Sequence, residues 1–405
     1  MVKIEPFAVE QWMDEYETKA KYNIAETCAA SISIDDLLQL SENKQQSREA
    51  LSTTSRKLTY GSIRGSEELR KNLSSLYSAR AAGLTKDGVL ITNGAIAANF
   101  LVLYSLVASS DHIICQYPTY EQLYQIPASL GAEVSLWKMD PTQKWKLDME
   151  QLKGLTKDNT KLIILNNPSN PTGQVLTKPL LEEIMDFAEE RNITVLCDEV
   201  YRPLFHSILP SDDDFPPSAI NLGHKNVIVT GSFSKAYSLA GIRVGWIASK
   251  NQSLIEQIAE TRHYTTISVS QLDQAVAAEV VSDRCVHALL TRNIQLAQKN
   301  LQLLTNFIDE HNWACSWVKP VAGTTCMVKF HKMGKPIDDV AFCKTLQEKT
   351  GVMFVPGNKC FGSGTDFKGY VRIGFVQETD VLKEALDALR KFMEEEYADL
   401  PIAAK

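Results

Sequence analysis

Hydrophobic positions between about residues 85 and 250 fall into short β-branched runs that are separated by longer amphipathic segments. This alternation is typical of a mostly parallel sheet covered by helices. One intervening segment, residues 178–191, carries apolar side chains at helical spacing with charged side chains opposite, which predicts a crossover helix. The β-branched runs predict strands at residues 88–92, 112–116, 133–137, 162–166, 194–197, 227–230 and 245–248.

The pattern changes from about Ser253 to long helical segments that continue through Ile308. Strands are expected near residues 324–330 and 369–375, followed by a closing helix to about Tyr397. These elements predict a second, smaller α+β lobe. We expect a large domain at residues 51–280, a small domain at 281–405, and an N-terminal arm, residues 1–50, that packs on the small domain. The polar segment 47–56 is predicted to be irregular.

Composition places the chain among folded globular proteins. It has 405 residues, of which 44% are hydrophobic and 22% charged. Lys and Arg number 42 against 49 Asp and Glu, a net charge of −7, so the chain lacks the basic surface of a nucleic-acid binder. No apolar stretch approaches the roughly 18 residues of a membrane span. Neither nucleic acid nor membrane is an expected partner.

The cysteines and histidines form no recognisable metal or disulfide motif. Eight cysteines are scattered without a Cys-x-x-Cys pair, as expected for reduced thiols in the cytosol. The N-terminal segment is acidic and lacks the features of a signal peptide, so we predict a cytoplasmic location. The seven histidines lie at least eighteen positions apart, and no metal site is expected.

Polar side chains cluster just after three of the predicted strands, and Arg243 follows eight residues beyond Lys235. Ligands of open α/β sheets bind at the carboxyl ends of strands, so these positions are candidates for a site. Each is unremarkable alone, because a single lysine is usually a solvated surface residue and a single aspartate usually caps a helix. They are the Asn-Pro-Ser-Asn-Pro-Thr-Gly turn at 167–173, Asp198 with Tyr201, Ser232 with Ser234 and Lys235, and Arg243.

In combination these motifs resemble the pyridoxal-phosphate enzymes of the class I and II aminotransferase family. Asn-Pro-Thr-Gly, Asp-Glu-x-Tyr and then Ser-x-Ser-Lys…Arg, in this order along the chain, form a highly specific combination, and the resemblance covers nearly the whole chain. It implies the α/β fold known as fold type I, with a mostly parallel seven-stranded sheet in the large domain and a smaller α+β domain. It also implies pyridoxal 5′-phosphate as the cofactor.

The resemblance assigns a role to each motif residue. Lys235 would form the Schiff base with the cofactor and then act as general base at Cα. Asp198 would keep the pyridine nitrogen protonated, and Tyr201 and Asn170 would donate to the ring's phenolate oxygen. The phosphate would be bound by a guanidinium and two hydroxyls, those of Arg243, Ser232 and Ser234.

Further cofactor contacts follow from the same resemblance. Gly94, Ala95 and Ile96 open an apolar predicted helix, whose free backbone amides form an anion site. Tyr120 matches the aromatic residue that stacks on the cofactor ring. Tyr60 matches a tyrosine that reaches the phosphate of the neighbouring subunit, which implies a homodimer.

Two residues are expected to bind the substrate together with Asn170. Arg372 matches the arginine that binds the α-carboxylate, a bidentate task that suits a planar guanidinium. Glu26 lies in the sequence Ile-Ala-Glu-Thr, which is similar to a Leu-Ala-Glu-Asn motif. Most members of the family instead carry a glycine in the corresponding stretch. The stretch around Glu26 is similar to aminocyclopropane-carboxylate synthases, whose glutamate lies next to the substrate. The alternative is that Glu26 caps a helix or faces solvent.

These features predict an enzyme that acts on a neutral or cationic L-α-amino acid through an external aldimine and a quinonoid. Elimination, replacement or cyclisation, as in a carbon–sulfur lyase, is favoured, and transfer of the amino group to a keto acid is the alternative. A carboxylate at Glu26 would oppose an acidic side chain, so aspartate and glutamate are not expected as substrates. A non-enzymatic ligand sensor and a nicotinamide-dependent dehydrogenase are competing readings. The chain has no helix-turn-helix for the former and no glycine fingerprint for the latter.

Overall fold

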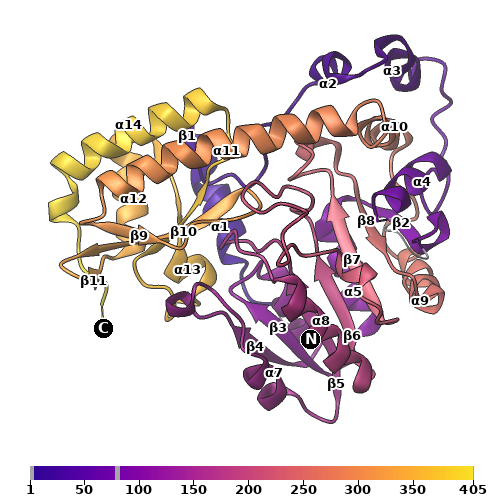
Figure 1. The fold of residues 1–405 in the computed structure, drawn as a ribbon, viewed down its shortest axis with the longest axis horizontal. Helices are drawn as coiled ribbons and strands as arrows, with labels where there is room; N and C mark the ends of the chain where they lie inside the picture. The colour runs from indigo at the N-terminus through magenta and orange to yellow at the C-terminus, as the bar shows by residue number, and fades with distance from the viewer. Residues whose placement is uncertain (1–3, 78–82, 405) are drawn as a thin grey trace.

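The central layer of the computed structural model, which describes residues 4–77 and 83–404, is a seven-stranded sheet (Figure 1). Its strand order is β2-β8-β7-β6-β5-β3-β4. All pairings are parallel except those of β8 with β2 and β7. The predicted mostly parallel sheet is therefore confirmed. Its strands are β2 (Val89–Thr92), β3 (His112–Tyr117), β4 (Glu133–Lys138), β5 (Thr160–Asn166), β6 (Thr194–Asp198), β7 (Val227–Ser232) and β8 (Gly245–Ala248).

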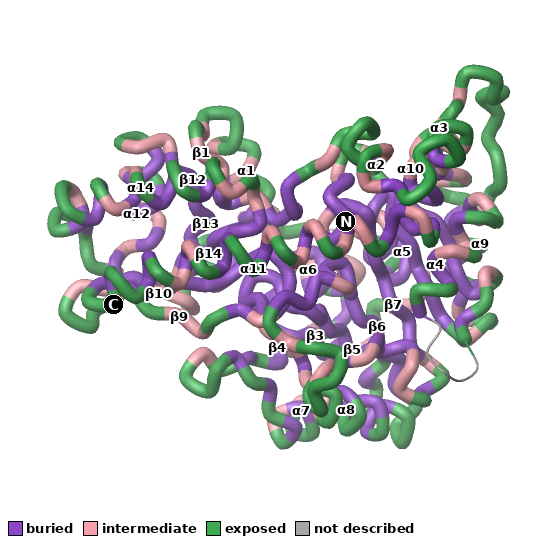
Figure 2. The backbone as a smooth tube through the Cα atoms, turned by 45° about the horizontal axis from the view of Figure 1, so that its top comes forward, coloured by how far each residue is buried: buried purple, intermediate pink, exposed green. Residues whose placement is uncertain are grey.

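Both faces of this sheet are buried, as their nearly continuous apolar sequences require (Figure 2). Successive side chains of a strand point to opposite faces, so Ile113 and Cys115 of β3 join one hydrophobic cluster and Ile114 joins another. Helices α5 (Gly94–Leu106), α6 (Gln122–Ser129) and α9 (Gln252–Arg262) cover the first face. The second face is covered by α4 (Glu67–Leu76), α7 (Met149–Leu155), α8 (Lys178–Glu190) and α10 (Gln271–Val280).

A smaller sheet forms a second lobe around its own hydrophobic cluster. Its strands run in the order β11-β10-β14-β13, and β9 also pairs with β10. The elements are β9 (Cys315–Trp317), β10 (Thr325–Lys332), β11 (Lys335–Pro336), β13 (Val355–Pro356) and β14 (Tyr370–Gly374), with α12 (Asp339–Thr350), α13 (Gly357–Phe361) and α14 (Thr379–Glu395).

The long helix α11 (Val286–Glu310) connects the two lobes. Leu289, near its start, belongs to the cluster of the large sheet, whereas Leu301 and Leu304 belong to that of the small sheet. Between these ends, Asn293 donates from Nδ2 to the carbonyl oxygen of Ala236, at 2.8 Å. The helix therefore fixes the small lobe relative to the lysine-bearing loop after β7.

The N-terminal segment crosses the boundary between the lobes. Helix α1 (Ala8–Tyr16) buries Trp12, whose indole N–H donates to the carbonyl oxygen of Phe354 at 2.9 Å. Strand β1 (Tyr22–Asn23) then pairs in parallel with β12 (Val352–Met353). Further along, Leu37 of α2 (Ile34–Leu40) is buried in the cluster of the large sheet. The domain boundaries at residues 50 and 280 stay a prediction.

One segment that was predicted to be irregular is partly helical. Helix α3 runs over Lys44–Leu51. Asn43 caps it by accepting a hydrogen bond from the backbone N–H of Gln46, at 3.1 Å. Ser47 is fully buried and its hydroxyl donates to Glu279 of α10. The prediction failed because a polar sequence is held helical here by a cap and a tertiary contact.

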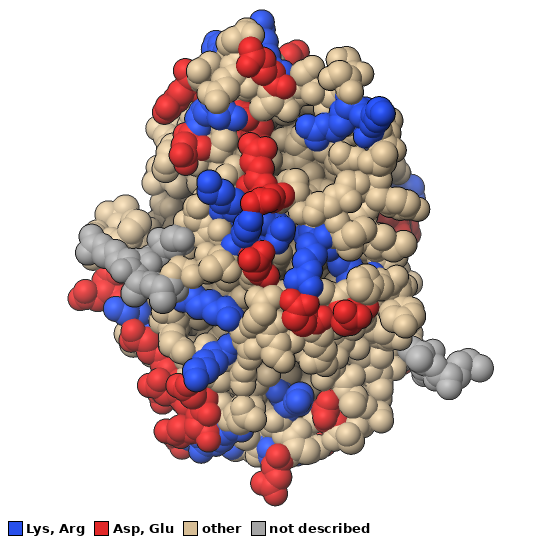
Figure 3. All heavy atoms as spheres, turned by 90° about the vertical axis from the view of Figure 1, so that its right-hand side faces the viewer, with Lys and Arg blue, Asp and Glu red and all other residues tan. Residues whose placement is uncertain are grey.

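The surface carries charges of both signs. On the face in Figure 3, Lys and Arg side chains are interspersed with Asp and Glu. Among the described residues, no helix is long and apolar enough to cross a bilayer, and no group of three or more His, Cys, Asp or Glu could bind a metal ion. All eight cysteines are free and buried.

Candidate active site

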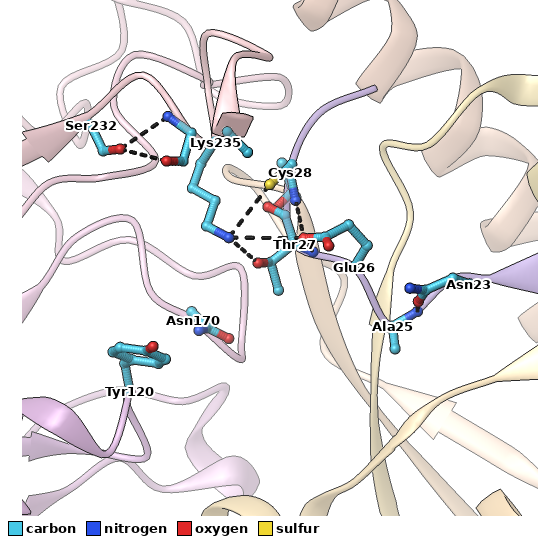
Figure 4. A network of polar contacts seen from close by, with 12 residues as sticks. Asn23, Ala25, Glu26, Thr27, Cys28, Tyr120, Asn170, Ser232 and Lys235 are labelled. Carbon is cyan, nitrogen blue, oxygen red and sulfur yellow. Dashed lines mark hydrogen bonds and ion pairs between the residues drawn. The ribbon is translucent and has the colours of Figure 1, made fainter. Parts of the chain in front are cut away.

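Lys235 lies at the centre of the candidate site. Strand β7 ends at Ser232, whose hydroxyl accepts a hydrogen bond from the backbone N–H of Ser234 at 3.0 Å and so tightens the turn before the lysine. The Lys235 ammonium then points to the N-terminal segment (Figure 4). Its Nζ donates to Thr27 Oγ1 at 2.5 Å, lies 3.6 Å from Cys28 Sγ, and lies 3.9 Å from Glu26 Oε1.

The charge of Lys235 is set by two opposing effects. Burial disfavours the ammonium, but the acidic groups of Cys28, Tyr201 and Glu26 outweigh it and raise the pKa of Lys235. Burial also raises the pKa of the Cys28 thiol to about 11, so that thiol stays protonated near neutral pH. Glu26 is therefore the anionic partner of Lys235 among these three groups.

Asp198 stands at the carboxyl end of β6 and is almost fully buried. Its Oδ2 accepts from the side-chain amide of Asn99 at 2.8 Å, and its Oδ1 accepts from the backbone N–H of Val200 at 3.0 Å. Asn99 is itself oriented by the Thr230 hydroxyl, which donates to its Oδ1 at 2.7 Å. Burial raises the pKa of Asp198 to about 6. A cationic group beside this carboxylate would remove that cost.

The turn after β5 connects to the small lobe through Arg372. The backbone N–H of Asn170 donates to Asn166 Oδ1 at 2.7 Å, which fixes the turn. Arg372 of β14 donates from Nη1 to Asn170 Oδ1 at 3.3 Å and from Nη2 to the Ala25 carbonyl oxygen at 3.0 Å. The Arg372 side chain is buried, and its Nε has no hydrogen-bond partner within the described residues. Such an orphaned donor suits an anionic ligand.

Arg243 faces the N-terminus of helix α5. A Cβ atom on Gly94 would lie 2.8 Å from Arg243 Nη2, and one on Gly245 would lie 2.7 Å from the backbone nitrogen of Ala95. Gly94 also has a φ of 76°, which a side chain would disfavour. Arg243 Nη1 lies 3.4 Å from the hydroxyl of Ser234. Guanidinium, hydroxyl and free helix amides thus meet where an anion can bind.

Two tyrosines lie on other sides of the site. Tyr201 is buried, which raises the pKa of its phenol, and its side chain contacts Thr27. Tyr120 donates from its hydroxyl to Glu10 Oε1 of α1 at 2.7 Å, and its ring centroid lies 4.8 Å from that of Phe7. Tyr120 is therefore held by the N-terminal segment.

A single cavity of about 340 Å³ brings most of the predicted residues together. Gly94 does not line it but lies next to Arg243, which does, whereas Tyr60 does not line it and is 72% exposed. The role of Tyr60 in a second subunit stays a prediction. The predicted residues that line the cavity are Glu26, Ala95, Ile96, Tyr120, Asn170, Asp198, Tyr201, Ser232, Ser234, Lys235, Arg243 and Arg372.

Some lining residues were not predicted from the sequence. Asn99 had a usable signal, because an amide inside an apolar helix needs a buried partner. The loop at 205–217, which follows β6 and Tyr201, does not line the cavity. Phe205 instead forms a bridge with Ala322 and packs on Phe215. The unpredicted lining residues with polar side chains are Glu10, Glu17, Thr27, Cys28, Asn99 and Asn166.

This donor set fits pyridoxal 5′-phosphate. An amine, a buried carboxylate, an amide and a phenol converge on one cavity, and a glycine cradle beside Arg243 leaves room for a phosphate at a helix N-terminus. The raised pKa of Asp198 fits a partner that carries a proton and a positive charge, such as a pyridinium nitrogen.

Comparisons with known proteins agree with this fit. Residues 33–389 match the family model described as aminotransferase class I and II. A PLP-dependent aminotransferase structure from Streptococcus suis superposes with a TM-score of 0.87 at 37% identity, covering 97% of this chain and 98% of that one. Capreomycidine synthase of Streptomyces vinaceus is 27% identical over 94% of this chain and 92% of its own length. Aspartate aminotransferase of Thermotoga maritima is 27% identical over 82% and 83%.

Proposed function

The chain belongs to the class I and II aminotransferase family, and on this premise we propose a reaction for it. It is an enzyme that depends on pyridoxal 5′-phosphate. We propose that it removes the Cα proton of a neutral or cationic L-α-amino acid and then expels a substituent of the substrate's side chain, by elimination, replacement or cyclisation. The observation that carries the proposal is the carboxylate of Glu26, 3.9 Å from the amine of Lys235.

The cofactor would be held by the residues that converge on the cavity. Lys235 would bind it covalently, Asp198 would pair with its ring nitrogen, and Asn170 and Tyr201 would donate to its phenolic oxygen. When bound, it supplies an electron sink for the pair left at Cα. Tyr120 would cover the ring face, and the phosphate would lie among Gly94, Ala95, Ile96, Ser232, Ser234 and Arg243.

Proton transfer falls to Lys235. Once substrate displaces it from the cofactor, its neutral Nζ can accept the Cα proton. The Thr27 hydroxyl, 2.5 Å from Nζ in this structure, would orient the amine for this step. Arg372 would bind the α-carboxylate with both arms of its guanidinium and so place the Cα–H bond toward Lys235.

Glu26 determines what the side chain of the substrate can be. Its Oε1 accepts from the backbone N–H of Thr27 at 2.6 Å and of Cys28 at 3.1 Å. Burial by itself would raise the pKa of Glu26, but Lys235 and these N–H groups outweigh burial and lower it. The ionised carboxylate would attract a cationic side chain or hold a leaving group, and it would oppose aspartate and glutamate.

Amino-group transfer is the second candidate. It is favoured by the similarity to the aminotransferases of Streptococcus suis and Thermotoga maritima. Both reactions begin with the same proton removal by Lys235. They would differ in the next step. In transfer Lys235 would deliver that proton to the bound group, whereas in elimination a bond in the substrate's side chain would break.

A homodimer in the cytoplasm is the assembly and location we propose. A second cavity, about 390 Å³ and mainly apolar, is lined by Ile96 and Phe100 of α5, which are 43% and 38% exposed. Exposed apolar surface of this kind marks an interface, and Ile96 also lines the candidate active site. In a dimer Tyr60 would reach the partner's phosphate. Eight buried cysteines without a disulfide fit a reducing compartment.

Product analysis separates the two reactions. The purified enzyme is mixed with single L-amino acids, including S-substituted cysteines and cationic ones, without a keto-acid acceptor, and cofactor and products are measured by mass spectrometry. Many turnovers with release of ammonia, a thiol or a cyclised amino acid are expected. One turnover with stoichiometric pyridoxamine phosphate would instead establish the aminotransferase.

Glu26→Gln tests the carrying observation in the same assay. The change keeps the size and the oxygen that accepts from Thr27 and Cys28, but removes the charge. We expect at least a tenfold change in rate or in preference between cationic and neutral substrates. If neither changes, Glu26 has no part in the reaction.

A further inference from the structure

We infer that the substrate's side chain ends in a cationic guanidinium or ammonium group, and that Glu10 and Glu17 recognise it together with Glu26. This inference rests on the proposed function, because it concerns the side-chain end of the same cavity. The three glutamates all line that cavity, and two of them come from an N-terminal segment that contributes no residue to the predicted cofactor site.

Helix α1 presents one face to the cavity. Glu10 and Met13 of α1 and Glu17, which directly follows its last turn, are spaced by three and four positions, so they lie on one side, and all three line the cavity. Glu15 of the same helix, five positions after Glu10, lies on the other side and does not line the cavity. The orientation of the helix therefore determines which of its acidic side chains line the cavity.

That orientation is fixed by contacts on the helix's other faces. Trp12 is 1% exposed and donates to the carbonyl oxygen of Phe354. The backbone N–H of Ala8, at the start of the helix, donates to Glu121 Oε2 at 2.9 Å. Glu10 is further held by the hydroxyl of Tyr120. Its carboxylate is therefore placed at the cavity by the fold.

Arg372 offers a positive charge for the other end of the substrate, the α-carboxylate. It is 3% exposed, lines the same cavity, and keeps an unpartnered Nε among the described residues. This buried, incompletely satisfied cation marks the place of the substrate's α-carboxylate. An L-α-amino acid bound there has its side chain free to extend toward other walls of the cavity, and α1 forms one of them.

Charge balance leaves the glutamates without a cationic partner in the loaded site. The cationic side chains that line the cavity are Lys235, Arg243 and Arg372. Arg243 would pair with the cofactor phosphate, Arg372 with the α-carboxylate, and Lys235 would be a neutral amine once the substrate has displaced it. Asp198 would be matched by the ring nitrogen.

Glu10, Glu17 and Glu26 then face the cavity with no lining cation left to neutralise them. A positive group on the substrate's side chain supplies the missing charge. A neutral side chain of equal length would leave three carboxylates uncompensated, and an acidic one would add a fourth. We therefore expect charge at the side-chain end, beyond shape or length, to dominate selectivity.

Matched amino acids test this in the holoenzyme. L-Arginine and L-citrulline have nearly the same length and shape but differ in charge, and L-lysine with L-norleucine form a second pair for an ammonium. The Kd of each is taken from the concentration dependence of the first absorbance change after rapid mixing, which precedes turnover. We expect one cationic member to bind at least about tenfold more tightly than its neutral counterpart.

Variants of α1 connect this ratio to the glutamates. Glu10→Gln keeps an oxygen that can accept from Tyr120, and Glu17→Gln is its companion on the same face. Each should lower the ratio at least about threefold, and the double variant should bring it close to one. Glu15→Gln, with the same charge change on the side of α1 that faces away from the cavity, should leave the ratio within about twofold.

Two outcomes would overturn the inference. Equal Kd values within both pairs in the wild type would remove the cationic substrate class. A ratio that survives in the Glu10→Gln/Glu17→Gln variant, folded by thermal melting, would remove the role of α1. If instead no amino acid changes the absorbance of the cofactor-loaded enzyme, the proposed function itself fails.

Discussion

At the scale of single residues, Asp198 illustrates how burial prepares a group for a partner. Its carboxylate is enclosed by Asn99 and the Val200 N–H, and burial raises its pKa from 3.8 to about 6. Its two hydrogen bonds do not fully offset the desolvation of the carboxylate, so a protonated nitrogen beside Asp198 would be stabilising. The same carboxylate therefore lowers the stability of the cofactor-free fold and would raise the stability of the cofactor-loaded one.

This gives a pH dependence with a definite sign. In the folded, cofactor-free chain Asp198 keeps its proton up to about pH 6, whereas the unfolded chain releases it near pH 4. The free energy of unfolding therefore falls as the pH rises from about 4 to about 6. Between pH 5 and 7 the fall from this group is about 1 kcal/mol. Urea unfolding of the wild type and Asp198→Asn at both pH values measures it.

The comparison of the two proteins isolates this group. Asp339 and Glu121 also have pKa values raised by burial, to about 6 and about 7, but they act equally in both proteins. The variant should lose about 1 kcal/mol less than the wild type between pH 5 and 7. An identical loss in both would show that Asp198 does not carry the cost.

Arg372 is the second residue whose role can be tested directly. Its guanidinium already reaches Asn170 and the Ala25 carbonyl oxygen, and Nε is left over within the described part of the chain. Lysine cannot keep two such contacts while offering a planar pair to a carboxylate. Arg372→Lys should raise KM at least about tenfold, measured by steady-state kinetics. Unchanged affinity would mean that the α-carboxylate binds elsewhere.

At the scale of elements, the strands of the large sheet were predictable from the sequence, whereas the position of helix α1 within the N-terminal arm was not. Apolar runs such as β3 and β5 are buried on both faces, so their sequences carry the signal of their structure. The position of α1 depends on the contact of Trp12 with Phe354, which no local pattern encodes. Glu10 and Glu17 therefore could not be assigned to the site from the sequence, whereas the motif residues after the strands could.

The arm can be loosened without touching the cavity. Trp12→Ala removes a buried indole and its hydrogen bond, which should lower the free energy of unfolding by about 3 kcal/mol or more. It should also expose α1 to limited proteolysis and raise KM, while the cofactor stays bound. Trp313→Ala is the matched control, because Trp313 is 56% exposed. Equal protease sensitivity of the two variants would contradict the anchoring role.

At the scale of the whole molecule, the candidate site is assembled from both lobes. Ala25 and Arg372 lie at opposite ends of the chain and meet at 3.0 Å over the loop that carries Asn170. Their meeting depends on α11, which belongs to both hydrophobic clusters. The family resemblance could predict that these residues share one site, because it assigns Asn170 and Arg372 to the same substrate. Residue patterns alone could not place the small lobe over the sheet.

The proposed homodimer is tested by the mass of the protein in solution and by removal of the Tyr60 hydroxyl. Light scattering should give about twice the 45.2 kDa of one chain. Tyr60→Phe should weaken cofactor retention several-fold in dialysis, because the hydroxyl would reach the partner's phosphate. Tyr104→Phe, another exposed tyrosine, should leave retention unchanged. A monomer mass would exclude a shared site.

The central claim is that Lys235 binds pyridoxal 5′-phosphate in the cavity between the lobes. The most direct measurement is borohydride reduction of the purified holoenzyme, followed by peptide mass spectrometry. We expect the cofactor to be fixed to the peptide that contains Lys235, and the Lys235→Ala protein to carry none covalently. Attachment to another lysine, or a wild-type protein that fixes no cofactor, would contradict it.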